Sequence, residues 1–145
     1  MKIFTLLECE ETCDFALFGL ISSTRDYTLA WAVGRALRLR LARQPELHLR
    51  LLAGNRLTFG YYEHRTETST YRLFRNRCLG ASALKKPFLA PDMKEYDYLL
   101  TVAGAAADPA PANEALLPRL AALAAVQYVC QFDPNTLKYK ENLIF

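Results

Sequence analysis

The sequence predicts an α+β fold, in which a mostly antiparallel sheet carries two packed helices. Short segments that alternate between apolar and polar residues, or are apolar on both faces, recur along the chain and are typical of strands. Only two stretches carry apolar residues at helical spacing. Hydrophobic residues make up 52% of the 145 residues, which is enough for one core. We expect a single domain over residues 1–145 with the element order β-α-β-β-β-β-α-β.

The first strand is expected near 13–22, and because it is apolar on both faces it should lie in the interior of the sheet. Residues 22–24 are good helix N-caps, and Asp26 follows Ser23 by three residues as in a capping box. The helix should then continue to about Leu41. Its predicted buried stripe consists of Leu29, Ala32, Val33, Ala36 and Leu37.

Three antiparallel strands are predicted to follow as a meander, near 46–52, 56–63 and 69–78. A turn at 53–55 separates the first two, and a polar run separates the second from the third. Gly60 lies inside the second segment and suggests a β-bulge.

The fifth strand is expected at 96–103, apolar on both faces and therefore interior, after a turn that begins at Pro91. A second helix is predicted from Asn113 to about Ala125, with Pro118 as a disruption, and a last strand at 126–132. The chain ends in an apolar tail at 133–145. Its last three residues, Leu143, Ile144 and Phe145, are expected to dock on the surface of the domain itself, on a second copy or on a partner.

The segment 90–98, APDMKEYDY, resembles the motif of the IPExxxVDY family of small bacterial proteins. Pro91, Asp97 and Tyr98 match that motif. The other three specified positions depart from it, since Ala90 stands in place of Ile, Asp92 in place of Glu and Tyr96 in place of Val. Residues 18–32 and the C-terminal tail are also similar to the family. The resemblance implies a family identity but no mechanism, because the family has no assigned activity. The motif positions that it singles out are Pro91, Asp92, Asp97 and Tyr98, and we expect Asp97 to anchor the turn or to pair with an Arg.

The net charge of +3 is unevenly distributed, since residues 35–77 hold ten Arg and no Lys against three acidic residues. The composition of a genome rich in G and C is one explanation, and an anion-binding face is the other. Such a face would place Arg between the aromatic side chains of the meander, where bases stack and phosphates bind. The aromatic pattern of RNA-recognition modules is not matched. The candidate residues are Arg50, Arg56, Arg72, Arg75 and Arg77.

No catalytic, metal-binding or cofactor-binding residue is predicted. His48 and His64 have no acid or thiol at motif spacing, and we expect both to be surface residues. Cys9 and Cys13 lack the second ligand pair of a zinc site. The glycines do not form a phosphate-binding loop.

Localisation is predicted to be cytoplasmic. The four Cys form no CxxC pair and are interpreted as reduced thiols, no signal peptide is evident, and no apolar run reaches the ~20 residues that span a bilayer. We expect a non-catalytic protein-interaction module that binds an unknown protein or a second copy of itself, and no membrane. The alternative is a nucleic-acid-associated protein (RNA or DNA) that uses the Arg-rich segment 35–77. A small-molecule enzyme or binder is the third hypothesis.

Overall fold

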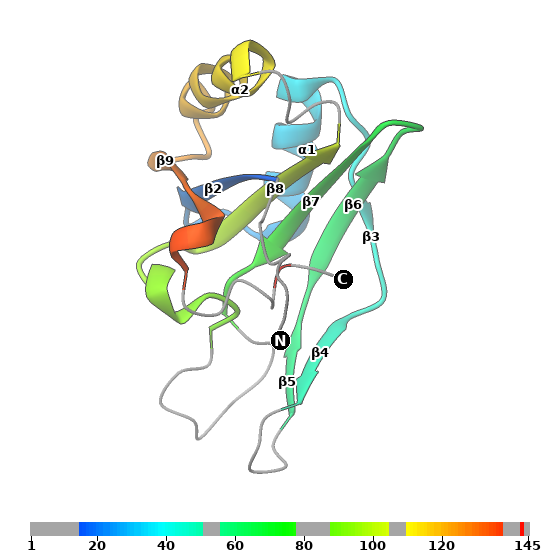
Figure 1. Ribbon diagram of the computed structural model, residues 1–145, viewed down its shortest axis with the longest axis vertical. Coiled ribbons are helices and arrows are strands. Elements are labelled where there is room, and N and C mark those ends of the chain that lie inside the picture. Colours follow the sequence, from blue (N-terminus) through cyan, green and yellow to red (C-terminus); the bar gives the residue numbers. More distant parts are fainter. Residues whose placement is uncertain (1–14, 51–55, 78–87, 105–109, 138–142, 144–145) are drawn as a thin grey trace, which may run out of the picture.

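The computed structural model describes residues 15–50, 56–77, 88–104, 110–137 and 143. Its main sheet has six strands, and every neighbouring pair is antiparallel (Figure 1). The strands are β2 (Ala16–Ile21), β3 (Ala42–Arg43), β6 (Tyr61–Arg65), β7 (Ser69–Arg75), β8 (Tyr98–Gly104) and β9 (Tyr128–Phe132). Their spatial order is β3-β6-β7-β8-β2-β9. The predicted α+β class is confirmed.

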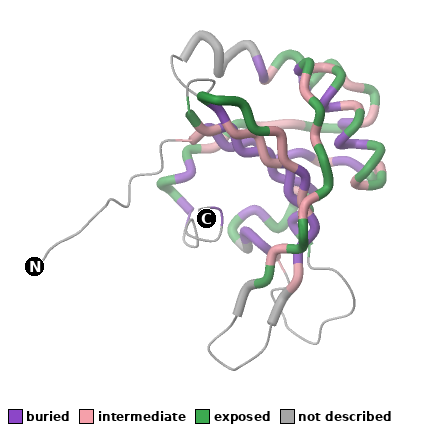
Figure 2. The backbone as a smooth tube through the Cα atoms, turned by 90° about the vertical axis from the view of Figure 1, so that its right-hand side faces the viewer, coloured by how far each residue is buried: buried purple, intermediate pink, exposed green. Residues whose placement is uncertain are grey.

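Two helices, α1 (Asp26–Leu37) and α2 (Ala110–Ala121), contact each other and share one hydrophobic core with a face of the sheet. Helix α1 contributes Leu29, Val33 and Leu37, and α2 contributes Leu116 and Leu120. The opposite face of the sheet has a second core, covered by the segment before β8 and by the end of the chain. Figure 2 shows that the buried residues follow the central strands.

The interior positions predicted for β2 and β8 are confirmed, because β8 lies between β7 and β2, and β2 lies between β8 and β9. Strict alternation divides each strand between the two cores, as the period of two requires. In β2, Phe18 packs on the helix side and Leu17 on the other. In β8, Leu100 and Leu99 are divided in the same way.

Helix α1 is shorter than predicted, because it ends at Leu37 and not near Leu41. Arg38 adopts the left-handed conformation with φ 60°. Its backbone N–H donates to the carbonyl of Arg35, and the N–H of Leu39 donates to the carbonyl of Gly34. Gly34 permits this turn, since a Cβ there would lie 2.8 Å from the carbonyl oxygen of Leu39. The buried stripe therefore includes Ala30 and Gly34, whereas Ala32 and Ala36 are only partly buried.

The expected capping box is also absent. The N-cap of α1 is Arg25, which makes no side-chain capping bond. The Ser22 hydroxyl donates instead to the carbonyl of Ala125 at 2.5 Å and accepts the N–H of Thr24 at 3.1 Å. A contact with the segment that leads into β9 thus replaces the local cap.

The strand predicted over 56–63 is two strands, β5 (Arg56–Phe59) and β6, divided at Gly60. Strand β5 pairs with β4 (Leu47–Arg50) in a separate two-stranded sheet, while β6 pairs with β7 and β3. The meander is therefore divided between two sheets, and β3 was not anticipated. The carbonyl of Gly60 accepts the N–H of Arg75 at 3.0 Å, so the backbone at Gly60 already contacts β7.

Helix α2 begins and ends earlier than predicted, so Pro118 lies in its last turn and not in its first turns. A proline lacks the N–H that would bond to the carbonyl four residues earlier, and α2 ends three residues after Pro118. The predicted apolar positions Leu116 and Leu120 are buried, Leu117 and Leu123 are partly buried, and Ala124 is exposed.

The C-terminal segment packs on the molecule itself at the points where it is described. After β9 the chain makes a short 3-10 helix, η2 (Pro134–Thr136), in which the Asp133 carboxylate accepts the N–H of Asn135 at 3.0 Å. Leu137 and Leu143 both belong to the second core, and Leu143 is only 3% exposed. Ile144 and Phe145 lie outside the described residues.

Candidate functional site: a cationic cleft beside the motif turn

The motif turn is organised by one buried side chain, Asn76, which follows β7 and is 0% exposed. Its amide nitrogen donates to the carbonyls of Met93 at 2.9 Å and Tyr96 at 3.0 Å. Its amide oxygen accepts the N–H of Ala90 at 2.8 Å. These bonds hold both ends of the 3-10 helix η1 (Pro91–Met93), where the fixed φ of proline suits the first position. Asn76 thus shapes the turn that precedes β8.

The backbone of Asn76 also bonds to the segments on both sides of the motif turn. Its N–H donates to the carbonyl of Asp97 at 3.0 Å, and its carbonyl accepts the N–H of Leu89 at 2.7 Å. On the other side of the turn, the Tyr96 ring packs over Gly19, where a Cβ would lie 2.8 Å from that ring. The absence of a side chain at Gly19 therefore lets the motif turn lie against β2.

Asp97 and Tyr98, two of the motif residues, hold the loop between β2 and α1. The Asp97 carboxylate accepts the N–H of Ser22 at 2.8 Å, and the Tyr98 hydroxyl donates to the carbonyl of Thr24 at 2.6 Å. Asp97 therefore acts as an anchor and does not pair with an Arg among the described residues. Asp92 is exposed on η1.

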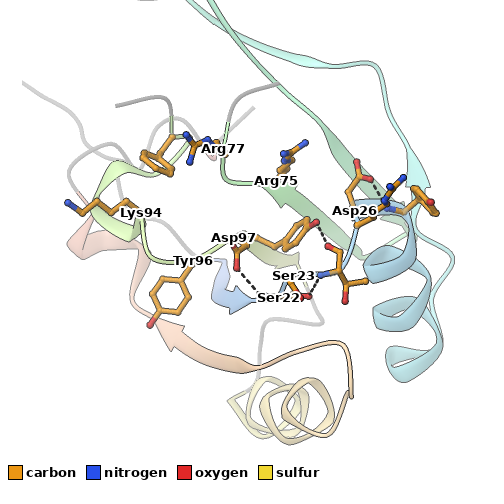
Figure 3. A pocket seen from close by; sticks show the side chains of 13 residues that line it. Ser22, Ser23, Asp26, Arg75, Arg77, Lys94, Tyr96 and Asp97 are labelled. Carbon is orange, nitrogen blue, oxygen red and sulfur yellow. Dashed lines mark hydrogen bonds between the residues drawn. The ribbon is translucent and has the colours of Figure 1, made fainter. Parts of the chain in front are cut away.

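Between this loop and the motif turn lies a cavity of about 590 Å³, which we call the cationic cleft. Residues 22–27, including the first turn of α1, form one wall, and Lys94 with residues 96–98 forms another. Arg75, at the end of β7, and Arg77 with Phe88 complete it. Figure 3 shows Lys94 and Asp26 at opposite ends of the cleft, with Arg75 and Arg77 along the side.

The charge of the cleft is positive. Its four cations are Arg25, Arg75, Arg77 and Lys94, all exposed, and no carboxylate of the described residues lies within ion-pair distance of them. Its two acidic residues are already engaged. Asp26 pairs with Arg43 at 3.3 Å, and Asp97 holds the Ser22 N–H. The Arg77 guanidinium lies 5.7 Å from the centre of the Phe88 ring. The first turn of α1 adds the positive end of its dipole.

Two tyrosine hydroxyls that line the cleft have a raised pKa. Burial raises the pKa of Tyr98 to about 12. Burial, with smaller effects from Cys130 and Tyr128, also raises the pKa of Tyr96. Arg side chains stay protonated throughout. This set of groups holds charge and donates hydrogen bonds, so it is suited to binding an anion.

The structure separates the five Arg that the sequence suggested as one anion-binding face. Arg75 and Arg77 line the cleft, but Arg72 pairs with Glu63 at 2.7 Å, with both side chains about 15% exposed. Burial raises the pKa of Glu63, but the hydrogen bond and charge of Arg72 outweigh it and leave that pKa lowered. Arg50 and Arg56 are register partners on the separate β4–β5 hairpin.

The aromatic residues of the meander do not form a stacking surface. Phe74 is fully buried, Tyr61 stacks on it with ring centres 5.5 Å apart, and Tyr62 is buried in the helix-side core. A half-buried strand and a strand with a row of exposed rings can carry the same alternating aromatic residues in sequence. The structure shows the half-buried arrangement. These three rings pack inside the molecule or on one another, and the nucleic-acid role predicted for the meander stays a prediction.

Neither His lines the cleft. His48 is exposed and its Nδ1 lies 3.0 Å from the Thr58 hydroxyl, and His64 lies on β6, not at a turn, with its Nδ1 near the backbone of Arg40. In the described ranges no three His, Cys, Asp or Glu side chains gather as metal ligands would. Cys9 and Cys13 lie outside the described residues.

Sequence reasoning missed Asn76, Arg25 and Lys94. Asn76 carries a signal, since a polar residue directly after an apolar strand is a common anchor for turns. Arg25 and Lys94 gave none, because only folding brings residues 25, 77 and 94 to one cleft.

Across the described segments, no helix combines the length and apolar character needed to cross a membrane. Comparison with models of protein families and with curated proteins gives no match for this chain. The resemblance to the IPExxxVDY family stays a prediction.

Proposed function

We propose that the protein is a non-catalytic binding module that holds a phosphate-like anion of its partner in the cationic cleft. The observation that carries the proposal is the set of four cations around a cavity of about 590 Å³ whose two carboxylates are already engaged. An anion entering there meets Arg guanidinium groups, which match phosphate and carboxylate oxygens in a bidentate way. The cytoplasm is the proposed location, which the free thiol of Cys130 supports.

The non-catalytic part of the proposal is supported by the chemistry of the lining. General acid–base catalysis needs a group whose pKa lies near the working pH. Tyr98, with its pKa at about 12, and the permanently charged Arg75 and Arg77 offer no such group. The same residues make a stable, preorganised set of donors for a bound anion.

The test is binding of short-chain polyphosphate, measured by calorimetry over a series of salt concentrations. We expect affinity that falls as salt rises, because phosphate contacts release counterions. Arg75→Glu and Arg77→Glu should each weaken binding at least tenfold. Arg119→Glu is the matched control, since Arg119 is exposed on α2, outside the cleft, and makes the same change in net charge. Equal loss in all three variants, or no binding at low salt, would overturn the proposal.

A second copy of the chain is the protein partner that we propose, through the edge strand β9. In the part of the chain that the structure describes, β9 pairs with β2 on one edge only. Its sequence, YVCQF, carries no charge or proline to discourage pairing. In an antiparallel pair centred on Cys130, Tyr128 of each copy would lie opposite Phe132 of the other. The interface would therefore contain two aromatic cross-strand pairs, and such pairs are favourable.

The symmetry of this pair gives its test, by sedimentation of the reduced protein. Cys130→Lys and Cys130→Glu each place like charges opposite each other at the two-fold axis, so each variant should be monomeric. An equimolar mixture of the two should restore a dimer, because the charges are then opposite. A wild-type protein that stays monomeric, or single variants that still dimerise, would exclude this interface.

A further inference from the structure

Exposed aromatic rings continue the line of cations from the cleft along α1. Tyr27 and Trp31 are 59% and 63% exposed and, being four residues apart, lie on the same side of the helix. Arg35 follows after another four residues, and its guanidinium carbon lies 4.9 Å from the centre of the Trp31 ring. Large aromatic side chains are seldom left this exposed without a function when they lie together.

A second cavity, of about 410 Å³, lies beside these rings and shares the lining residue Tyr27 with the cationic cleft. Trp31, Arg35 and Arg40 line it, and Tyr27 lines both cavities. Two exposed rings therefore lie between the cations of the two cavities, and we call this set of residues the α1 track. In order from the cleft, the α1 track consists of Arg77, Arg75, Arg25, Tyr27, Trp31, Arg35 and Arg40.

We propose that the α1 track binds single-stranded nucleic acid, with phosphates at the Arg side chains and bases stacked on Tyr27 and Trp31. This inference rests on the proposed anion-binding function of the cleft and names the polymer that supplies the anion. Single strands are held in general by a positive groove combined with aromatic rings, because every base has a flat face that stacks on a ring.

The spacing of the rings favours a single strand over a duplex. Four residues of helix rise about 6 Å, which is wider than the ~3.4 Å between stacked bases. Two bases that each stack on one of these rings must therefore be unstacked from each other, as they are in an extended single strand. An acidic peptide would satisfy the Arg side chains but would leave the ring faces of Tyr27 and Trp31 without a matching flat group.

Trp31 is the only Trp in the chain, so its fluorescence reports directly on stacking. The probes are an oligouridylate of about 12 nucleotides and an abasic strand with the same number of phosphates. We expect the oligouridylate to quench Trp31 and the abasic strand to bind without quenching. With a dye-labelled oligouridylate, Trp31→Ala should weaken binding between about five- and a hundredfold, the loss of one stacked base, and Trp31→Phe should weaken it less. Neither variant should change binding of the abasic strand.

Gln127→Ala is the control, because it truncates an exposed side chain that lines neither cavity and lies outside β9. Equal binding of both strands, with no effect of Trp31→Ala, would overturn the inference and leave the anion-binding cleft standing. Binding of polyglutamate in a manner sensitive to Trp31, with no binding of oligouridylate, would overturn it in favour of an acidic protein partner. Failure of every polyanion to bind would overturn the proposed function and this inference together.

Discussion

Asn76 controls the cleft through bonds that no apolar residue can replace. Its side chain bonds to three backbone groups of 90–96, two of which belong to the buried residues Ala90 and Met93. A buried backbone group left without a partner costs about 1–3 kcal/mol. The motif turn thus depends on a residue that lies outside the motif itself.

We predict that Asn76→Ala lowers the free energy of unfolding by about 3 kcal/mol, because it removes the side-chain partner of the Tyr96 carbonyl and the Ala90 N–H. It also removes one of the two bonds of the Met93 carbonyl, which still accepts the N–H of Tyr96. Urea denaturation followed by circular dichroism measures this. Gln127→Ala, at an exposed position, should change stability by less than about 0.5 kcal/mol. A loss no greater than that of the control would show that Asn76 is not the anchor.

Tyr98 gives a prediction about pH. Burial raises its pKa from 10.0 to about 12, so the folded state favours the protonated phenol. The stabilisation is complete below about pH 10 and is lost as the pH rises toward 12. Tyr98→Phe removes the bond to the Thr24 carbonyl and should cost about 1 kcal/mol at neutral pH.

The matching observation is a comparison of both proteins between pH 9 and 12. The wild type should lose stability relative to Tyr98→Phe as the pH approaches about 12, because only the wild type must keep that phenol protonated. A constant difference over this range would contradict a raised pKa. Other tyrosines titrate in both proteins and cancel in the comparison.

At the scale of elements, the end of α1 determines where the edge strand β3 begins. The left-handed turn at Arg38 redirects the chain so that β3 pairs with β6 only four residues later. Arg there bears strain that glycine would not, because a Cβ crowds the carbonyl in this conformation. The length of α1 is therefore set by the geometry of its C-cap at Arg38, and not by a change in residue composition along the sequence.

Arg38→Gly should therefore raise the free energy of unfolding by about 1 kcal/mol, since it relieves the positive φ of 60°. Ala36→Gly, two residues earlier and inside α1, should lower it by about 1 kcal/mol. Thermal unfolding of both variants gives the comparison. Destabilisation by both would mean that the Arg38 side chain contributes more than its backbone costs.

At the scale of the whole molecule, the sheet has a core on each face, and the end of the chain closes one of them. The helices cover the face that includes Phe18 and Leu100. The motif turn, with Leu89 and Met93, covers the other face together with Leu143. The cationic cleft opens where these two layers meet at the start of α1.

We predict that Leu143→Ala lowers the free energy of unfolding by about 2–5 kcal/mol, as expected for a large buried side chain reduced to alanine. Glu95→Ala, which truncates an exposed side chain, should have little effect. Sedimentation should show an unchanged mass for Leu143→Ala, because Leu143 packs within its own chain. A change in mass without a change in stability would instead show that Leu143 belongs to an interface.

The sequence by itself determined the fold class, the two interior strands and the division of their side chains between two faces. It did so because alternation with a period of two is a local property that survives folding, as Leu17 and Phe18 in β2 show. The approximate positions of both helices followed from a period of 3.6 in the same way.

Only the tertiary structure decided which charges work together. Arg72, Arg75 and Arg77 are neighbours in sequence, yet Arg72 faces Glu63 across the strand pair while the other two join Lys94 and Arg25 at the cleft. The backbone at Gly60 also meets a distant group, because its carbonyl accepts the N–H of Arg75. Such contacts depend on which strands become neighbours, and this is fixed by the energy of the whole packed molecule and not by any local pattern.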